Sequence, residues 1–126
     1  MAAKILVVDD DSSILDLLRM HLNSAGYEVR TALDAIEAGH QIVKDPPALI
    51  LLDVGMPYMD GFEFLAALKA DKTLPDIPVV ILTSMEGGEA LSKQLGAVGY
   101  LMKPVRADRL LQIIALNVPG GSIPIG

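Results

Sequence analysis

Cysteine is absent from this chain of 126 residues. Disulfide bonds, thiolate catalysis and cysteine-ligated metals are therefore excluded. Basic residues are also scarce, with 10 Lys and Arg against 16 Asp and Glu, and the net charge is −6. Because phosphate binding needs a basic face, this charge argues against direct contact with nucleic acid. The excess of acidic residues is better suited to binding small metal cations than to binding nucleic acid.

Long apolar runs are also missing. The runs are short, as in ILVV at residues 5–8, whereas a membrane-spanning helix needs roughly 20 apolar residues. The opening MAAKILVVDDD does not resemble a signal peptide, because its apolar stretch is too short and ends in acid. We therefore expect a cytoplasmic protein without a membrane span, and the length is typical of one domain.

Short apolar runs alternate with segments of helical periodicity along the chain. The runs ILVV, LILL and VVIL lack polar alternation, which is typical of parallel strands covered on both faces. Ser12 and Ser13 are expected to cap the first helix, and Gly26 is expected to end it. We predict strands at 4–8, 27–32, 48–53, 78–84 and 99–103, and helices at 14–25, 34–45, 60–71, 87–97 and 106–118.

This alternation predicts an α/β domain with a doubly wound parallel sheet of five strands and with five helices. The domain is expected to occupy residues 1–118. The stretch PGGSIPIG that completes the sequence is rich in Gly and Pro and has no periodicity. It predicts a flexible tail or linker at 119–126.

Polar residues gather at the carboxyl ends of the predicted strands. In open parallel sheets these ends lie along one edge, where ligand sites occur. Adjacent carboxylates repel one another and raise one another's pKa, so a bound cation would explain why acids collect there. The residues expected at this edge are Asp9, Asp10, Asp11, Asp53, Thr83, Ser84 and Lys103.

A hard divalent cation such as Mg²⁺ takes oxygen ligands and typically uses one or two carboxylates plus a phosphate oxygen. Asp10 and Asp53 can supply the carboxylates, and Asp9 can hold a metal-bound water. Lys103 and Thr83 suit the oxygens of a phosphoryl group. This pattern favours a carboxylate that accepts phosphate, with Asp53 on the central strand as the nucleophile.

Four motifs, ILVVDDD, LLDVGMPYMDGFEFL, VVILTS and GYLMKP, follow one another along the chain. Together they resemble the receiver domain of bacterial response regulators, the CheY-like family, over roughly residues 3–118. The resemblance implies the flavodoxin-like strand order 2-1-3-4-5. It also implies a regulatory protein of a two-component phosphorelay that catalyses only its own phosphorylation and dephosphorylation.

The resemblance assigns roles to the acids. It implies that Asp53 is phosphorylated by a sensor histidine kinase or a phosphotransfer protein. It implies that Mg²⁺ is held by Asp10, Asp53 and the backbone carbonyl of Gly55, with Asp9 acting through water. Asp11 is expected to be a solvated residue at the start of the first helix rather than a ligand.

Further roles concern the phosphoryl group and the switch. The resemblance implies that Thr83, Lys103 and the backbone N–H of Ser84 contact phosphate. Tyr100 matches an aromatic residue that moves inward when Thr83 engages the phosphoryl group. The peptide bond before Pro104 is expected to be cis, a minority geometry even for proline. The expected output surface comprises the fourth helix, the fifth strand and the fifth helix.

Other features remain unassigned by the sequence. The Asp-Gly pair at 60–61 is interpreted only as a turn and helix-start signal. The spacing from Thr83 to Tyr100 is shorter than in CheY itself, which leaves the dimer geometry across the fourth helix, and whether a homodimer forms, open. The sequence names no kinase, pathway, output domain or target.

Two other classes of function compete with the regulatory one. A phosphatase of the haloacid-dehalogenase type also uses a nucleophilic aspartate, but it needs a second acid two residues later, and Gly55 stands there. A flavodoxin-like binder would need a Ser, Thr and Gly cradle after the first strand, where three Asp stand instead. The regulatory phospho-acceptor is therefore favoured.

Overall fold

The computed structural model describes residues 2–56 and 59–118. Its five strands form one parallel sheet in the order β2-β1-β3-β4-β5, so the predicted fold class and strand order are confirmed. The predicted tail at 119–126 lies outside the described residues. The strands are β1 (Lys4–Val8), β2 (Glu28–Ala32), β3 (Leu49–Asp53), β4 (Val79–Thr83) and β5 (Gly99–Met102).

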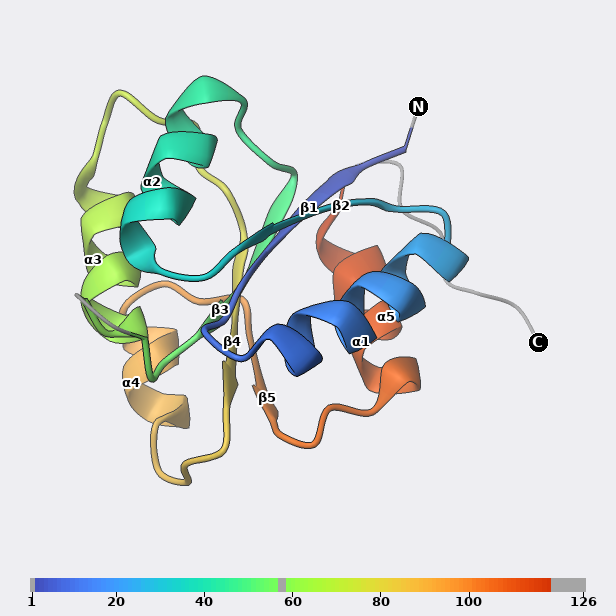
Figure 1. Ribbon diagram of the computed structural model, residues 1–126. Helices are drawn as coiled ribbons and strands as arrows, with labels where there is room; N and C mark the ends of the chain where they lie inside the picture. Colours follow the sequence, from blue (N-terminus) through green and yellow to red (C-terminus); the bar gives the residue numbers. More distant parts are fainter. Residues whose placement is uncertain (1, 57–58, 119–126) are drawn as a thin grey trace.

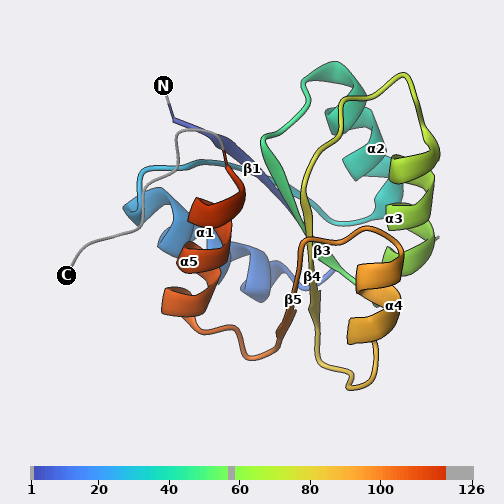
Figure 2. The same cartoon turned by 180° about the vertical axis from the view of Figure 1, so that it is seen from behind.

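Helices cover both faces of the sheet. Figures 1 and 2 show α1 and α5 on one face, with α2, α3 and α4 on the other. None of the helices in the described part of the chain is long and apolar enough to cross a membrane. The helices are α1 (Ser12–Ser24), α2 (Ala35–Lys44), α3 (Gly61–Ala70), α4 (Glu89–Gln94) and α5 (Ala107–Asn117).

The strands build two cores because successive side chains point to opposite faces of the sheet. Ile5 and Val7 of β1 pack with residues of α1 and α5, whereas Leu6 and Val8 pack with residues of α2 and α3. Every residue of β3 and β4 is buried. This two-sided burial explains why the central strands read as uninterrupted apolar runs.

The start of α1 differs from the sequence-based expectation. Asp11, not Ser12 or Ser13, caps the helix, and its Oδ1 accepts a hydrogen bond from the Ser13 amide at 3.0 Å. The reason is that a capping residue needs extended backbone just before the first turn. Asp11 has that backbone, whereas Ser12 is already helical. Gly26 follows the helix with φ of +93°, so its predicted role at the helix end is confirmed.

Helix α4 is shorter than predicted. The sequence indicated a helix over 87–97, but α4 has 6 residues. Gly87 and Gly96 explain the difference, because their φ angles of +91° and +101° lie in the left-handed region and cannot continue an α-helix. Among the predicted helices and strands, α4 shows the largest difference between predicted and observed length. The shortening leaves a loop from 84 to 88 between β4 and the helix.

Candidate functional site

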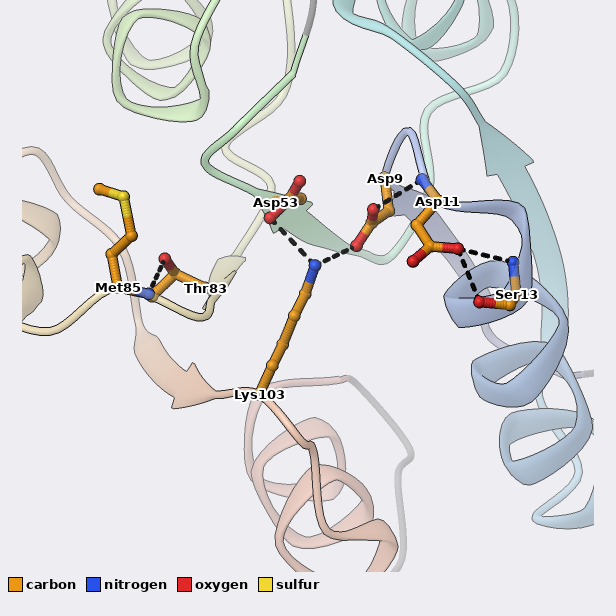
Figure 3. Close-up of polar contacts among 7 residues, drawn as sticks. All are labelled: Asp9, Asp11, Ser13, Asp53, Thr83, Met85 and Lys103. Atoms are coloured by element: carbon orange, nitrogen blue, oxygen red, sulfur yellow. Dashed lines mark hydrogen bonds and ion pairs between the residues drawn. The ribbon is translucent and has the colours of Figure 1, made fainter.

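The predicted site residues come together at the carboxyl edge of the sheet. Asp53 is the last residue of β3 and Thr83 is the last residue of β4. Asp9 directly follows β1, and Lys103 directly follows β5. Since all the strands are parallel, these four ends face the same way, and Figure 3 shows Lys103 reaching across toward Asp9 and Asp53.

Lys103 joins the two buried acids. Its Nζ lies 2.7 Å from Oδ2 of Asp9 and 3.2 Å from Oδ1 of Asp53. The Lys103 amide also donates a hydrogen bond to the carbonyl of Thr83 at 2.8 Å, and the peptide bond to Pro104 is cis. Contacts at both the backbone and the ammonium therefore define where this side chain lies.

The three consecutive aspartates have different surroundings. Asp9 is fully buried, and its Oδ1 accepts a hydrogen bond from the Asp11 amide at 3.0 Å. Asp10 and Asp11 are both exposed, and Asp11 is committed to capping α1. Asp9 and Asp10 therefore remain as the acids that can serve the edge of the sheet.

Burial and neighbouring charges shift the pKa values of Asp53 and Lys103. Burial raises the pKa of Asp53 above its ordinary value, the charge of Asp9 raises it further, and Lys103 offsets part of the effect. Burial alone would lower the pKa of Lys103. Its hydrogen bond to Asp9 and the charges of Asp53 and Asp9 outweigh that effect, and the pKa is raised. Lys103 is therefore the cation that makes a buried pair of acids tolerable.

The acids offer a set of oxygen ligands suited to a divalent cation. One carboxylate oxygen from each of Asp9, Asp10 and Asp53 can be chosen so that all three lie within 4.8 Å of one another. Carboxylates without nitrogen or sulfur ligands are what Mg²⁺ prefers. Gly55 lies two residues past Asp53, is exposed, and has open space where a side chain would stand. The donor chemistry therefore fits Mg²⁺.

The predicted switch residues are linked through a residue that the sequence did not single out for this role. Oγ1 of Thr83 accepts a hydrogen bond from the Met85 amide at 3.0 Å, and Tyr100 donates its hydroxyl to the Met85 carbonyl at 2.8 Å. Ser84, predicted as a phosphate contact, is exposed between them. Sequence reasoning missed this link because the link uses the backbone amide and carbonyl of Met85, which every residue type except proline carries.

Tyr100 also connects the edge to the outer surface. A groove of about 600 Å³ between α4 and β5 is lined by Tyr100 together with Ala90, Lys93 and Met102. Of these lining residues, Met102 is apolar and 39% exposed. A movement of Tyr100 would therefore alter a partly apolar surface.

A doubly wound sheet with paired acids and a lysine at its carboxyl edge defines a CheY-like module. The response regulator receiver domain family matches residues 5–115, and the chain belongs to this family. Receiver domains are regulatory parts of two-component systems, so this chain is a regulatory domain of that kind.

The relatives and solved structures agree with this assignment. Response regulator PleD of Caulobacter vibrioides is 44% identical over 107 residues, which are 83% of this chain and 24% of PleD. The transcriptional regulatory protein PhoP of Bacillus subtilis, named for alkaline phosphatase synthesis, is 42% identical over 106 residues, 82% of this chain and 43% of PhoP. The chain thus spans less than half of these two relatives.

Two solved structures match this chain over most of their own length. Chemotaxis protein CheY4 of Vibrio cholerae superposes with a TM-score of 0.85 at 37% identity, covering 94% of this chain and 100% of CheY4. A CheY-like receiver domain protein from Methanospirillum hungatei JF-1 gives 0.82 at 36% identity, covering 90% of this chain and 91% of its own. Both similarities extend over nearly the whole domain.

Proposed function

We propose that this domain accepts a phosphoryl group on Asp53 from a phosphohistidine of a sensor histidine kinase or phosphotransfer protein, in a reaction that depends on Mg²⁺. The observation that carries the proposal is the placement of Asp53 beside Asp9 and Asp10, with Lys103 Nζ contacting both Asp53 and Asp9. Asp53 is 6% exposed, lies at the central strand's end, and has Lys103 Nζ at 3.2 Å.

The chemistry is an in-line transfer. An oxygen of the Asp53 carboxylate forms a bond to phosphorus while the bond from phosphorus to the donor's imidazole nitrogen breaks. The nitrogen keeps the electron pair and is protonated, and the product is an acyl phosphate on Asp53. Asp53 must be ionised to attack, and the Lys103 ammonium beside it favours that form.

The remaining residues have supporting roles in the proposal. Asp10, Asp53 and the Gly55 carbonyl would hold Mg²⁺, with Asp9 acting through water, and the bound ion would neutralise charge on the phosphoryl oxygens. Lys103, the Thr83 hydroxyl and the Ser84 amide would contact those oxygens. A hydroxyl can donate its proton while accepting another, so the bond from Met85 does not prevent Thr83 from taking this role.

The output of the domain is a change of surface. Phosphorylation adds charge and strong acceptor oxygens at Asp53, and Thr83 and Tyr100 would respond through their shared contact with Met85. This would shift a pre-existing equilibrium between two forms of the α4, β5 and α5 face.

The experiment that tests the proposal is phosphorylation with acetyl phosphate and Mg²⁺, followed by location of the adduct by mass spectrometry. We expect one phosphoryl group on Asp53 and its loss in Asp53→Asn. Asp16→Asn, an exposed acid on α1, is the matched control and should react like wild type. Labelling of Asp53→Asn at the wild-type rate, or labelling that is unchanged in EDTA, would reject the proposal.

A further inference from the structure

Gly61, the first residue of α3, lies directly against the backbone at the end of β3. A Cβ built on residue 61 would lie 2.5 Å from the carbonyl oxygen of Asp53, 2.8 Å from Cα of Val54 and 3.1 Å from the carbonyl carbon of Asp53. Real Cβ atoms essentially never come within 3.0 Å of such neighbours. Because the crowded atoms belong to the backbone, no side-chain rotation can relieve the contact.

The need for glycine here is spatial rather than conformational. Gly26, Gly87 and Gly96 have positive φ angles, whereas Gly61 is not among the glycines with left-handed backbone. The interpretation of the Asp-Gly pair at 60–61 as only a turn and helix-start signal is therefore incomplete. Asp60 does cap α3, but Gly61 also allows the helix to approach β3.

Gly61 contacts the backbone of Asp53 and of Val54, the proposed phospho-acceptor and the residue that follows it. The Gly61 amide donates a hydrogen bond to the carbonyl of Val54 at 2.8 Å, and the Met56 amide donates to the same oxygen at 3.2 Å. On the other side, the Val54 amide donates to the carbonyl of Leu82 in β4 at 3.3 Å. The chain just after Asp53 is thus held between β4 and the first turn of α3.

We propose that Gly61 is a positioning residue for phosphoryl transfer to Asp53. Its missing side chain lets α3 hold the Asp53–Val54 peptide where the carboxylate meets Lys103. The inference rests on the proposed function of Asp53. Transfer depends on alignment, and a displacement of about 1 Å can cost on the order of a hundredfold in rate. A Cβ at 61 must push on this peptide, and so it must move the acceptor.

The test compares Gly61→Ala with wild type in the full chain, using acetyl phosphate with Mg²⁺ at saturation. We expect the rate at saturating donor to fall by at least about tenfold. The donor concentration that gives half the maximal rate should stay within about twofold, because Gly61 is buried and offers no surface to the donor. A purely structural defect would instead lower the folded fraction and leave the rate per folded molecule unchanged.

Two variants serve as controls. Gly39→Ala makes the same chemical change on α2, where a Cβ meets nothing within 4 Å. Ile42→Ala removes buried packing on α2, away from the site, and lowers stability. Per folded molecule, both should react within about twofold of wild type. If folded Gly61→Ala reacts as fast as Ile42→Ala, Gly61 is not a positioning residue.

Asp60→Ala keeps the proposal testable if Gly61→Ala does not fold. It removes the capping bond from the Glu63 amide to Asp60 Oδ1, 2.9 Å long, and loosens the first turn of α3 without adding a Cβ at 61. A loss of at least about threefold per folded molecule supports the proposal, and an unchanged rate overturns it. Asp53→Asn is run in parallel. If Asp53→Asn is labelled as fast as wild type, the proposed function itself is rejected. If folded Gly61→Ala is labelled on Asp53 at the wild-type rate, only the role of Gly61 is rejected.

Discussion

The hydroxyl of Tyr100 donates a hydrogen bond to the carbonyl oxygen of Met85 at 2.8 Å and so ties β5 to the loop after β4. The amide of the same Met85 donates to Oγ1 of Thr83 at 3.0 Å. Thr83 and Tyr100 are 17 positions apart in the sequence, and their side chains bond to the amide and to the carbonyl of the same residue, Met85. The loop between β4 and α4 therefore links the proposed phosphoryl site to the surface formed by α4 and β5.

Thr83 and Tyr100 should be energetically coupled. Thr83→Ala and Tyr100→Phe each remove a hydrogen bond and should cost about 0.5–1.5 kcal/mol of unfolding free energy. Because both bonds order Met85, the double variant should depart from additivity by at least about 0.5 kcal/mol, measured by urea unfolding. Thr83→Ala combined with Tyr27→Phe is the control pair and should be additive. Additivity in both pairs would contradict the link.

Asp53 should make stability depend on pH. Since burial and the charge of Asp9 raise its pKa in the folded state, the folded protein binds more protons than the unfolded chain just above the ordinary Asp pKa. Its stability, relative to Asp53→Asn, should therefore fall as the pH rises through that range. Lys103, whose pKa is raised, stays charged there and loses its contribution only in alkaline solution.

This pH dependence is measured by urea unfolding in EDTA between about pH 4 and pH 7. Asp16→Asn, which changes an exposed acid on α1, is the control and should run parallel to wild type. A wild-type advantage over Asp53→Asn that grows with pH would show that Lys103 outweighs burial and Asp9.

Asp10 should matter mainly when magnesium is present. It is exposed, and its charge is the weakest of the causes that act on the Asp53 pKa. In EDTA, Asp10→Asn should therefore melt at or slightly above the temperature of wild type. Mg²⁺ at about 100 times its dissociation constant should stabilise wild type by about 2.7 kcal/mol and the variant by less, so the order reverses. Equal magnesium shifts in both proteins would remove Asp10 from the binding site.

Loss of the Lys103 charge should lower stability more in the absence of Mg²⁺ than in its presence. Lys103→Met leaves the fully buried Asp9 carboxylate without its cation, which should cost about 3 kcal/mol in EDTA. Excess Mg²⁺ should restore part of this loss, because it brings positive charge to the same acids. Lys93→Met, on the exposed side of α4, is the control and should change stability by less than about 0.5 kcal/mol. Unchanged stability of Lys103→Met in EDTA would contradict this account.

If Asp53 carries a phosphoryl group, its lifetime should depend on residues 55 and 85, which follow two positions after Asp53 and Thr83, both proposed to contact that group. Gly55 has open space beyond its Cα, and the Met85 side chain is 62% exposed, so neither can orient a water by hydrogen bonding. A variant with Gly55→Asn and Met85→Glu should therefore lose its phosphoryl group at least about threefold faster. Decay is followed with Mg²⁺ present after the donor is removed. Equal decay would mean that water orientation at these positions does not limit the lifetime.

The sequence by itself determined the order of the elements and the residues that gather at the carboxyl edge. Hydrophobic periodicity is local, and parallel strands carry their final residues to one edge, so Asp9, Asp53, Thr83 and Lys103 can be grouped from their positions in the chain alone. The sequence does not determine where α1 begins, because Asp11, Ser12 and Ser13 all have side chains that can cap a helix. Only the backbone angles at Asp11 decide among them.

The tertiary structure decided which atoms meet. It selected Lys103 as the partner of both Asp9 and Asp53, and it joined Thr83 to Tyr100 through the backbone of Met85. It also turned Gly61 from a turn signal into a point of close contact. These relationships join groups that are distant in the chain, and several use backbone atoms that every residue shares. The side chain of Met85 therefore carries no signal for the link between Thr83 and Tyr100. For all of these contacts, only the packing of α3, β4 and β5 around β3 brings the atoms within reach.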